Sequence, residues 1–425
     1  MRMKFAALAV WFVVGIVAAP TQAADRLTLN DAFVRVAQNH PNLRLVNASA
    51  AILAAEREQA TQRPPWTLGA EIENALGTGD ASGMGGAELT LSLASALELG
   101  GKLDARRTLA QSRIDALAVQ RETQRLDLLA ETARRYLAVV EAERAGDIAR
   151  RDVEQRQRTV AAARQRLSAG ASPESVVLTA QAALARAELA LARAQQQAAA
   201  AKQHLAALWG ERKPDFDVTG SPLALPQIAS LRVLSDELAH SPELMAFADE
   251  QRIGEARLQL ARSQAAPDLQ WQVGVRRLQE TGDAALVAGL SMPLGSRSRA
   301  QPQIHAAEAE LEALSIGREA KDLSLYSTLV EAHGRYTVAQ AEVQRLQDDV
   351  LPKLAQAEHA AERAYRAGAI SYLEWAQLQS EQTVTRQQQL DVALQAQLAL
   401  IEIQRLTGQS LVVAPAVPAP SGESR

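Results

Sequence analysis

The chain has 425 residues, a formal net charge of −4 and no cysteine. The absence of cysteine excludes disulfides and thiolate metal sites, and no nucleic-acid partner is expected because such a surface needs a strong basic excess. Aromatic residues make up only 4% of the chain while alanine is abundant, a composition that favours long, closely packed helices over a thick globular core.

The first 23 residues predict export. Residues 1–4 are basic, residues 5–19 form an apolar run, and residues 21–23 offer small side chains at which a signal peptidase can cut. The apolar run is shorter than the roughly 20 residues that a membrane-spanning helix needs. We therefore expect residues 1–23 to be a cleaved signal peptide and not an anchor, and we expect no later stretch to reach the length of a spanning helix.

The remaining chain repeats itself at a spacing of about 200 residues. The matched segments occur in the same order in both halves: residues 39–43 with 240–244, 166–170 with 365–368, and 208–210 with 406–408. This duplication predicts a first repeat over residues 24–210, a linker over residues 211–230 and a second repeat over residues 231–411. Residues 412–425, rich in proline and alanine, are expected to be disordered.

Each repeat contains two short segments in which apolar residues alternate with polar or small ones. These segments cover residues 66–73 and 87–93 in the first half and residues 269–276 and 286–292 in the second. Their length approaches that of a tilted membrane strand, roughly 9 to 11 residues. Segments rich in turn-forming residues separate the two members of each pair. Taken alone, the strands also fit two amphipathic hairpins on a soluble core. In a membrane, the side chains expected to face lipid are Trp66, Leu68, Leu89, Leu91, Trp271, Val273, Leu286 and Leu290.

Long helices decide between those two arrangements. Residues 102–168 and 299–366 read as helix almost without a break, about 100 Å each at 1.5 Å per residue, which is more than a globular domain needs. Apolar residues recur at intervals of three, four and seven residues, which indicates a coiled-coil seam. In the returning helix, half of residues 180–207 are alanine. Pro352 lies deep inside the second long helix and predicts a kink there.

Four strands per chain cannot close a barrel, and lipid does not tolerate open sheet edges, so the barrel must be shared between chains. Two chains would give eight strands, with an interior filled by side chains, whereas three would give twelve strands and leave a lumen. The sequence thus predicts a mainly α protein with a small β part. Its four strands contribute to a shared outer-membrane β-barrel, joined to a long coiled-coil helical barrel that reaches into the periplasm.

Several short motifs punctuate the two repeats. They are residues 27–32 (LTLNDA), 39–41 (NHP), 97–102 (LELGGK) and 351–352 (LP). Together with the duplication they give the chain a resemblance, over essentially its whole mature length, to the TolC family of outer-membrane efflux ducts, and within it to the CzcC-like cation-efflux branch. The resemblance implies a homotrimer with a twelve-strand barrel, docked to a periplasmic adaptor and an inner-membrane RND pump. It implies passive conduction of substrate, heavy-metal cations in that branch, with no enzymatic activity and no cofactor.

The resemblance also implies functional residues at the two helix reversals. Both reversals would lie at the periplasmic tip, where the adaptor's helical hairpin would meet Arg166, Leu167, Ala169, Gly170, Tyr365, Arg366, Ala367 and Gly368. The alternative for the two glycines is a simple left-handed helix cap, which is common. Just past the second reversal, Glu374 and Gln377 occupy the place at which family members narrow the entrance. Three copies of Glu374 would form a ring of charge that favours cations.

No catalytic or metal site stands out in the sequence. The six histidines are scattered and lack a His-Glu-x-x-His pattern. His359 and Glu362 lie one helical turn apart, as residues on a solvated helix face often do, so we expect no metal site. A periplasmic adaptor is the alternative from another class of protein, although it would show one helical hairpin between lipoyl-like β domains. For a duct, drugs and type I secreted polypeptides are the alternative cargoes.

Overall fold

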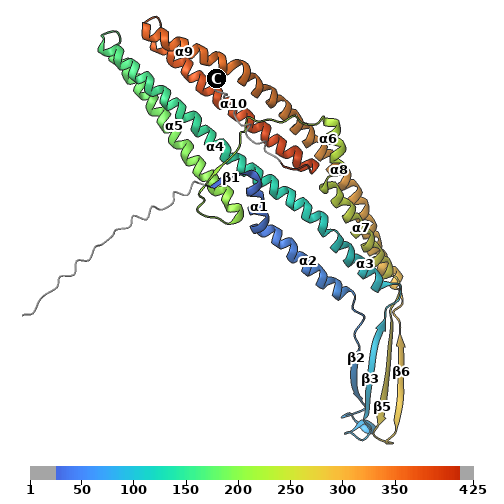
Figure 1. The fold of residues 1–425 in the computed structure, drawn as a ribbon. Coiled ribbons are helices and arrows are strands. Elements are labelled where there is room, and N and C mark those ends of the chain that lie inside the picture. The colour runs from blue at the N-terminus through green and yellow to red at the C-terminus, as the bar shows by residue number, and fades with distance from the viewer. Residues whose placement is uncertain (1–24, 412–425) are drawn as a thin grey trace, which may run out of the picture.

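The computed structural model describes residues 25–411, which form an elongated molecule with a sheet at one end and helices over the rest of its length (Figure 1). The expected signal peptide and the expected disordered tail lie outside the described residues. The prediction of a mainly helical chain with a small β part is confirmed.

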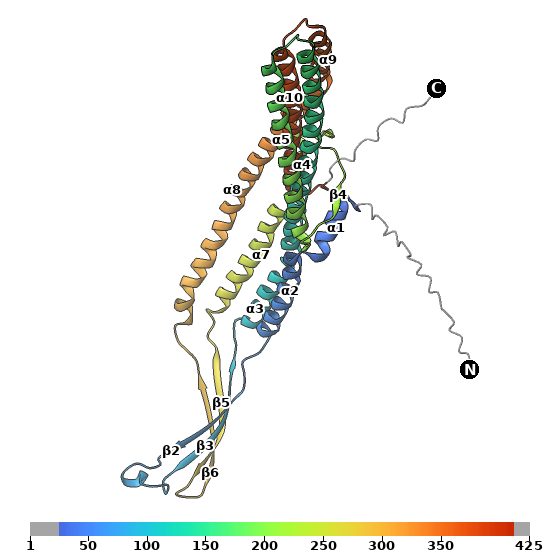
Figure 2. The same ribbon diagram turned by 90° about the vertical axis from the view of Figure 1, so that its left-hand side faces the viewer.

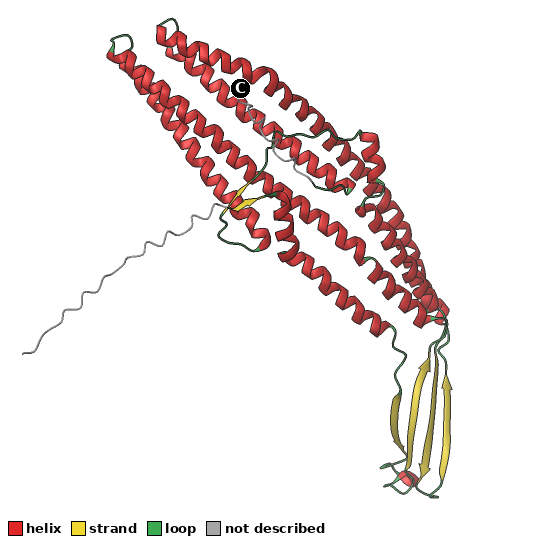
Figure 3. Cartoon of the chain, viewed as in Figure 1, coloured by secondary structure: helices red, strands yellow, loops and turns green. Residues whose placement is uncertain are grey.

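The sheet contains four antiparallel strands in the order β2, β3, β5, β6. Their bounds are β2 Thr67–Glu73, β3 Glu88–Leu97, β5 Leu269–Leu278 and β6 Ala284–Ser291. The first repeat supplies β2 and β3 and the second supplies β5 and β6, so the two repeats meet through the β3–β5 pair (Figure 3). The two hairpins predicted from the alternation are confirmed, and they form one continuous sheet whose edge strands are β2 and β6.

The register gathers apolar side chains on one face of the sheet. Trp271 lies opposite Leu290 and Val275 lies opposite Leu286, while Trp66, just before β2, packs edge-on against Trp271 with ring centroids 5.5 Å apart. Leu286 and Leu290 are 81% and 74% exposed, so the chain itself does not cover this face. The apolar face, as we call it, carries all eight residues that we expected to contact lipid: Trp66, Leu68, Leu89, Leu91, Trp271, Val273, Leu286 and Leu290.

The opposite face of the sheet carries polar and small side chains. Arg276 on β5 donates to Glu88 on β3 at 2.7 Å and to Glu73 on β2 at 2.5 Å, so one guanidinium joins three strands. At Gly274 a Cβ atom would lie 2.6 Å from the Leu91 carbonyl oxygen. Only glycine therefore lets β5 approach β3 this closely.

Each repeat extends from the sheet as a long helical hairpin. The first consists of α3 Lys102–Asp115, α4 Leu117–Ser168 and α5 Glu174–Ala206. The second consists of α8 Ser296–Arg345, a π-helical turn Leu346–Val350, α9 Leu351–Ala367 and α10 Tyr372–Thr407. Helix α4 packs against both α5 and α10, so the two hairpins lie side by side (Figures 1 and 2). The two long helical stretches predicted from the sequence are confirmed.

The proline in the second long helix is accommodated by a widened turn. Pro352 has no N–H group to donate to the carbonyl four residues earlier, and the π-helical turn Leu346–Val350 lies directly before it. The helix then continues as α9. The expected local distortion is present, in the form of a π-helical turn.

The remaining elements are shorter, and one of them, the 3-10 turn Gly79–Ala81, lies in the loop between β2 and β3. They are α1 Leu29–Asn39, α2 Pro41–Ala60, α6 Leu231–Leu238, α7 Pro242–Ser263, the 3-10 turns Gly79–Ala81 and Ala207–Trp209, and the strands β1 Asp25–Leu27 and β4 Phe216–Val218. Strand β1 pairs in parallel with β4, which lies within residues 211–230. The sequence analysis missed both strands, because three residues are too few to show an alternation.

Two buried tyrosines at equivalent positions of the repeats hold residues 211–230 in place. Tyr136 on α4 donates to the Leu27 carbonyl at 2.9 Å and accepts from the Thr219 N–H at 3.1 Å. Tyr336 on α8 donates to the Pro226 carbonyl, and burial raises the pKa of this phenol to about 12, so it remains a donor. Tyr136 and Tyr336 lie in two different hydrophobic cores, built mainly from the first and the second repeat, respectively.

One described helix, together with the 3-10 turn that follows it, is long and apolar enough to span a membrane. It covers Glu174–Trp209, so the expectation that no segment after the leader reaches that length is wrong. Alanine is the reason, because half of residues 180–207 are alanine and the segment packs lengthwise against α4. Small side chains let two helices approach closely, so the same composition serves a helix–helix contact.

Candidate functional site

The two hairpins reverse at the same end of the molecule, opposite the sheet (Figure 1). Gly170 and Gly368 have φ angles of +71° and +82°, in the left-handed region. The N–H of Gly170 donates to the Leu167 carbonyl at 2.9 Å, and that of Gly368 donates to the Tyr365 carbonyl at 3.0 Å. Both glycines therefore act as helix caps, and this role is compatible with docking of an adaptor.

Arg166 connects the two reversals. Its guanidinium donates to the Tyr365 carbonyl at 2.5 Å and to the Ala171 carbonyl at 3.3 Å, and it lies 4.9 Å from the centre of the Tyr365 ring. The structure thus brings the eight predicted tip residues together at one end of the molecule. Tyr365 is buried and Arg166 is half-buried, whereas the other six are exposed: Leu167, Ala169, Gly170, Arg366, Ala367 and Gly368.

The predicted gate residues lie just inside this end, on the first turns of α10. Glu374 forms a capping box with Ser371: its carboxylate accepts from the Ser371 N–H and from the Ser371 hydroxyl, both at 2.8 Å. These hydrogen bonds, led by the one from the Ser371 backbone, hold the pKa of Glu374 below its usual range. Glu374 therefore carries its negative charge at neutral pH and also caps the helix. Gln377 is exposed and lies one turn farther along α10.

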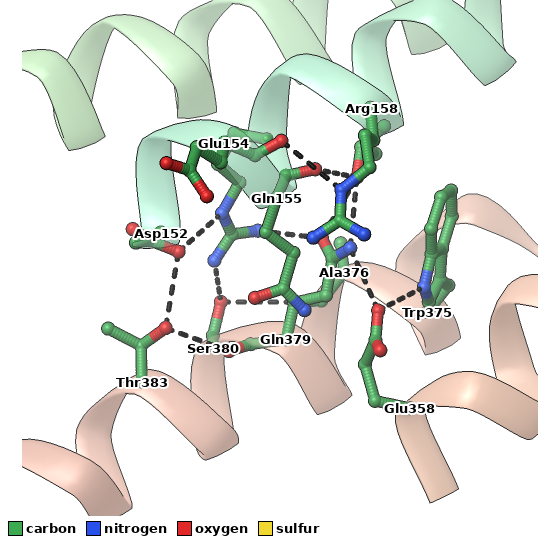
Figure 4. A network of polar contacts seen from close by, with 12 residues as sticks. Asp152, Glu154, Gln155, Arg158, Glu358, Trp375, Ala376, Gln379, Ser380 and Thr383 are labelled. Carbon is green, nitrogen blue, oxygen red and sulfur yellow. Dashed lines mark hydrogen bonds and ion pairs between the residues drawn. The ribbon is translucent and has the colours of Figure 1, made fainter. Parts of the chain in front are cut away.

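Below the tip, a buried polar network joins α4 to α9 and α10 (Figure 4). At its centre the Gln379 amide donates to the Thr159 hydroxyl at 2.9 Å and to the Glu358 carboxylate at 3.4 Å. The same carboxylate accepts from the Trp375 indole N–H at 3.1 Å. Gln379 and Trp375 are 0% and 1% exposed, so these bonds lie out of contact with water.

The network continues toward the sheet through an arginine. Arg156 donates to the Ser380 hydroxyl at 3.0 Å and to the Asp152 carboxylate at 3.2 Å, and that carboxylate also accepts from the Thr383 hydroxyl at 3.1 Å. The hairpins are therefore held together here by polar contacts, where an apolar seam was expected. The sequence analysis missed this network, because a buried glutamine and an exposed one look alike in a helical pattern.

Glu358, His359 and Glu362 lie close enough together to hold a metal ion, since their ligand atoms lie within 4.8 Å of one another. Glu358 already accepts from Trp375, and Glu362 accepts from Arg366 at 2.7 Å. An ion would have to compete with these bonds. We therefore assign Glu358 to the buried polar network, and His359 and Glu362 to the helix face beside it.

The sequence profile of the family described as outer membrane efflux protein matches residues 33–211 and 233–409, one stretch in each half of the duplication. The chain belongs to this family. It is an outer-membrane efflux channel of the TolC family with a periplasmic helical extension, and it is a transport protein, not an enzyme. The alternative of a periplasmic adaptor is wrong, because the channel-family profile covers both repeats.

Two metal-resistance proteins of Cupriavidus metallidurans are similar to the chain. The cobalt-zinc-cadmium resistance protein CzcC is 28% identical over 314 residues, 74% of this chain and 75% of CzcC. The nickel and cobalt resistance protein CnrC is 31% identical over 279 residues, 63% of this chain and 66% of CnrC. Among solved structures, CusC matches 90% of this chain and 92% of its own with a TM-score of 0.75 at 18% identity, which shows a common fold.

The network predicts a local effect of removing Gln379. The Gln379→Ala variant leaves the buried oxygens of Thr159 and Glu358 with fewer partners, at a cost of about 1 to 3 kcal/mol. Backbone amides around these residues on α4, α9 and α10 should then exchange about tenfold faster, as measured by hydrogen exchange and mass spectrometry. Gln387→Ala, which removes an exposed side chain from the same helix, serves as the control. Equal exchange in the two variants would show that the network does not hold the hairpins together.

Proposed function

We propose that this channel is the exit duct of a tripartite RND-type efflux system that exports heavy-metal cations. The observation that carries the proposal is the similarity to CzcC and CnrC, whose names state resistance to cobalt, zinc, cadmium and nickel. Among the described residues, the one group of side chains close enough to hold a metal ion is Glu358, His359 and Glu362, whose two carboxylates are already hydrogen-bonded. Cargo would therefore be selected by the pump, and the duct would conduct what the pump delivers.

We propose further that three copies assemble into the duct, with residues 1–23 removed on export. Edge strands β2 and β6 have backbone groups without partners on one side, and in lipid such groups must be paired. Joining β6 of one copy to β2 of the next would close a barrel. Three copies would give twelve strands and a lumen, whereas two copies would give eight strands, whose side chains would fill the interior. In that barrel the apolar face would contact lipid, and the face with Arg276 and Gly274 would line the water.

The tip would then dock the periplasmic adaptor. Six of the eight tip residues are exposed at the end of the molecule farthest from the sheet (Figure 1). At Gly170 no atom lies within 4 Å of the position that a Cβ atom would take, and at Gly368 the nearest atom is a nitrogen of the Arg166 guanidinium, at 3.7 Å. Small residues at both reversals would let the adaptor's helical hairpin approach the backbone closely.

Deleting this channel should make the host several-fold more sensitive to zinc, cadmium, cobalt or nickel, because a pump without its exit duct cannot discharge its cargo. The minimal inhibitory concentration of each salt checks this, with the chain restored on a plasmid as the control. Unchanged metal tolerance together with new sensitivity to drugs, or with loss of a secreted polypeptide, would assign one of the alternative cargoes and contradict the proposal.

Gly368→Trp should abolish export without lowering the amount of folded channel in the outer membrane, because the indole would occupy the docking surface. The backbone strain of the substitution is matched by Gly210→Trp, since Gly210 also has a positive φ, +83°, but lies at the end of α5 away from the tip. Resistance and membrane-fraction immunoblots are the measurements. If both variants export equally, the tip does not dock the adaptor.

Glu374→Gln should abolish the cation preference of the channel and preserve its fold, because glutamine at this position can still complete the capping box. The reversal potential of single channels under a salt gradient measures the preference. Since hydrogen bonds lower the pKa of Glu374, the wild-type preference should persist at mildly acidic pH and disappear only when the pH falls through the lowered pKa. Glu381→Gln, an exposed change farther along α10, is the control. Identical selectivity in wild type and Glu374→Gln would contradict the hypothesis that a ring of Glu374 side chains favours cations.

A further inference from the structure

A cavity lies between α4 and α10, next to the polar network and on its sheet side. Its volume is about 350 Å³, and residues 221–223 and Leu351 at the start of α9 complete its wall. The first and second repeats and the segment between them all contribute to it. No role described above uses this cavity.

Two arginines line the wall, Arg151, which is exposed, and Arg386, which is half-buried. Arg151 comes from α4 and Arg386 from α10. Within residues 25–411, neither side chain makes a hydrogen bond or an ion pair. Burial, and then the like charge of Arg151, lower the pKa of Arg386. Two cations held close together in a partly buried place are unfavourable unless an anion joins them.

The nearby acids are occupied elsewhere. Asp152 and Glu358 act on Arg386 through space, but Asp152 is bonded to Arg156 and Thr383, and Glu358 is bonded to Trp375 in the network. The positive charge of the cavity is therefore not neutralised by direct contact with a carboxylate.

A third arginine and its acid belong to the wall itself. Arg144 donates to the Gly220 carbonyl at 3.0 Å and lies 3.6 Å from Asp147, which also pairs with Arg150 at 2.9 Å. These contacts fix the segment that closes the cavity. Gln397 adds to this by donating to the carbonyls of Pro222 and Ala224 at 3.2 and 2.9 Å. The cavity is thus formed before any ligand arrives.

The remainder of the wall is apolar. It is made by Ile148, Pro222, Leu223, Leu351 and Leu390. A simple ion such as phosphate would satisfy the arginines but leave this surface in water. A ligand with an acid group at one end and an apolar body at the other fits both parts of the wall.

We propose that this cavity, the arginine pocket, binds a small organic anion, a carboxylate or a phosphate ester with an apolar group, whose acid oxygens accept hydrogen bonds from Arg151 and Arg386. The guanidinium group matches the planar geometry of such oxyanions, and charge-assisted hydrogen bonds of this kind are the strong ones. The ligand joins the two repeats at a point between the polar network and the π-helical turn. This role is separate from conduction through the duct.

The test uses the full chain purified in detergent at low ionic strength, with benzoate, phenyl phosphate and inorganic phosphate as probes in isothermal titration. At least one organic probe should bind, and inorganic phosphate should bind about tenfold more weakly than phenyl phosphate because it leaves the apolar wall uncovered. Arg386→Gln and Arg151→Gln should each lower the affinity for the organic probe by about tenfold or more. Arg158→Gln, an exposed change on the same helix, should leave affinity unchanged.

Which organic probe binds more tightly assigns the acid group as carboxylate or phosphate. The proposal is overturned if neither organic probe binds at millimolar concentration, if Arg386→Gln and Arg151→Gln bind as the wild type does, or if inorganic phosphate binds as tightly as phenyl phosphate. Circular dichroism shows whether Arg386→Gln is folded. If it is not, Arg151→Gln, which changes an exposed side chain, gives the deciding result.

Discussion

In a bilayer, every peptide group of the sheet must find its hydrogen-bond partner within protein, and the architecture follows from this constraint. Strands β3 and β5 satisfy each other across the repeat boundary, but β2 and β6 each keep one unpaired edge. The chain cannot satisfy these edges alone, so a shared barrel is the natural solution. The strands carry an apolar face and a polar face, as a wall between lipid and water requires, and Gly274 allows a close approach of β5 to β3.

The helices are held together differently, because they lie in water and pack mainly through small side chains. Alanine allows close contact along the hairpins but buries little apolar area per residue, so larger apolar side chains gather in local cores, two near the middle of the molecule and a smaller one near the tip around Tyr365 and Trp375. Tyr136 and Tyr336 anchor residues 211–230 against these cores. The duplication is therefore visible in the packing as well as in the sequence.

Toward the tip, the contact between the hairpins becomes polar. Gln379, Glu358 and Arg156 replace the aliphatic residues that would seal a simple coiled coil. A polar contact is specific in geometry, and separating it costs less where water can replace the lost bonds. Glu374, near the tip, combines a helix cap with a negative charge, and the arginine pocket adjoins the network on its sheet side.

The sequence by itself determined the duplicated plan, the four alternating strands and the long helices, because each of these follows from a local period along the chain. It also placed Gly170 and Gly368 at the reversals and predicted which strand residues share the apolar face, since strand periodicity sets the face. Only the tertiary structure decided the strand order, the pairing of β1 with β4, the contact of Arg166 with Tyr365, and the presence of Arg151 and Arg386 in the wall of one cavity. These contacts join residues of different repeats or of distant parts of the chain, and no local period records which distant residues will lie together once two repeats pack.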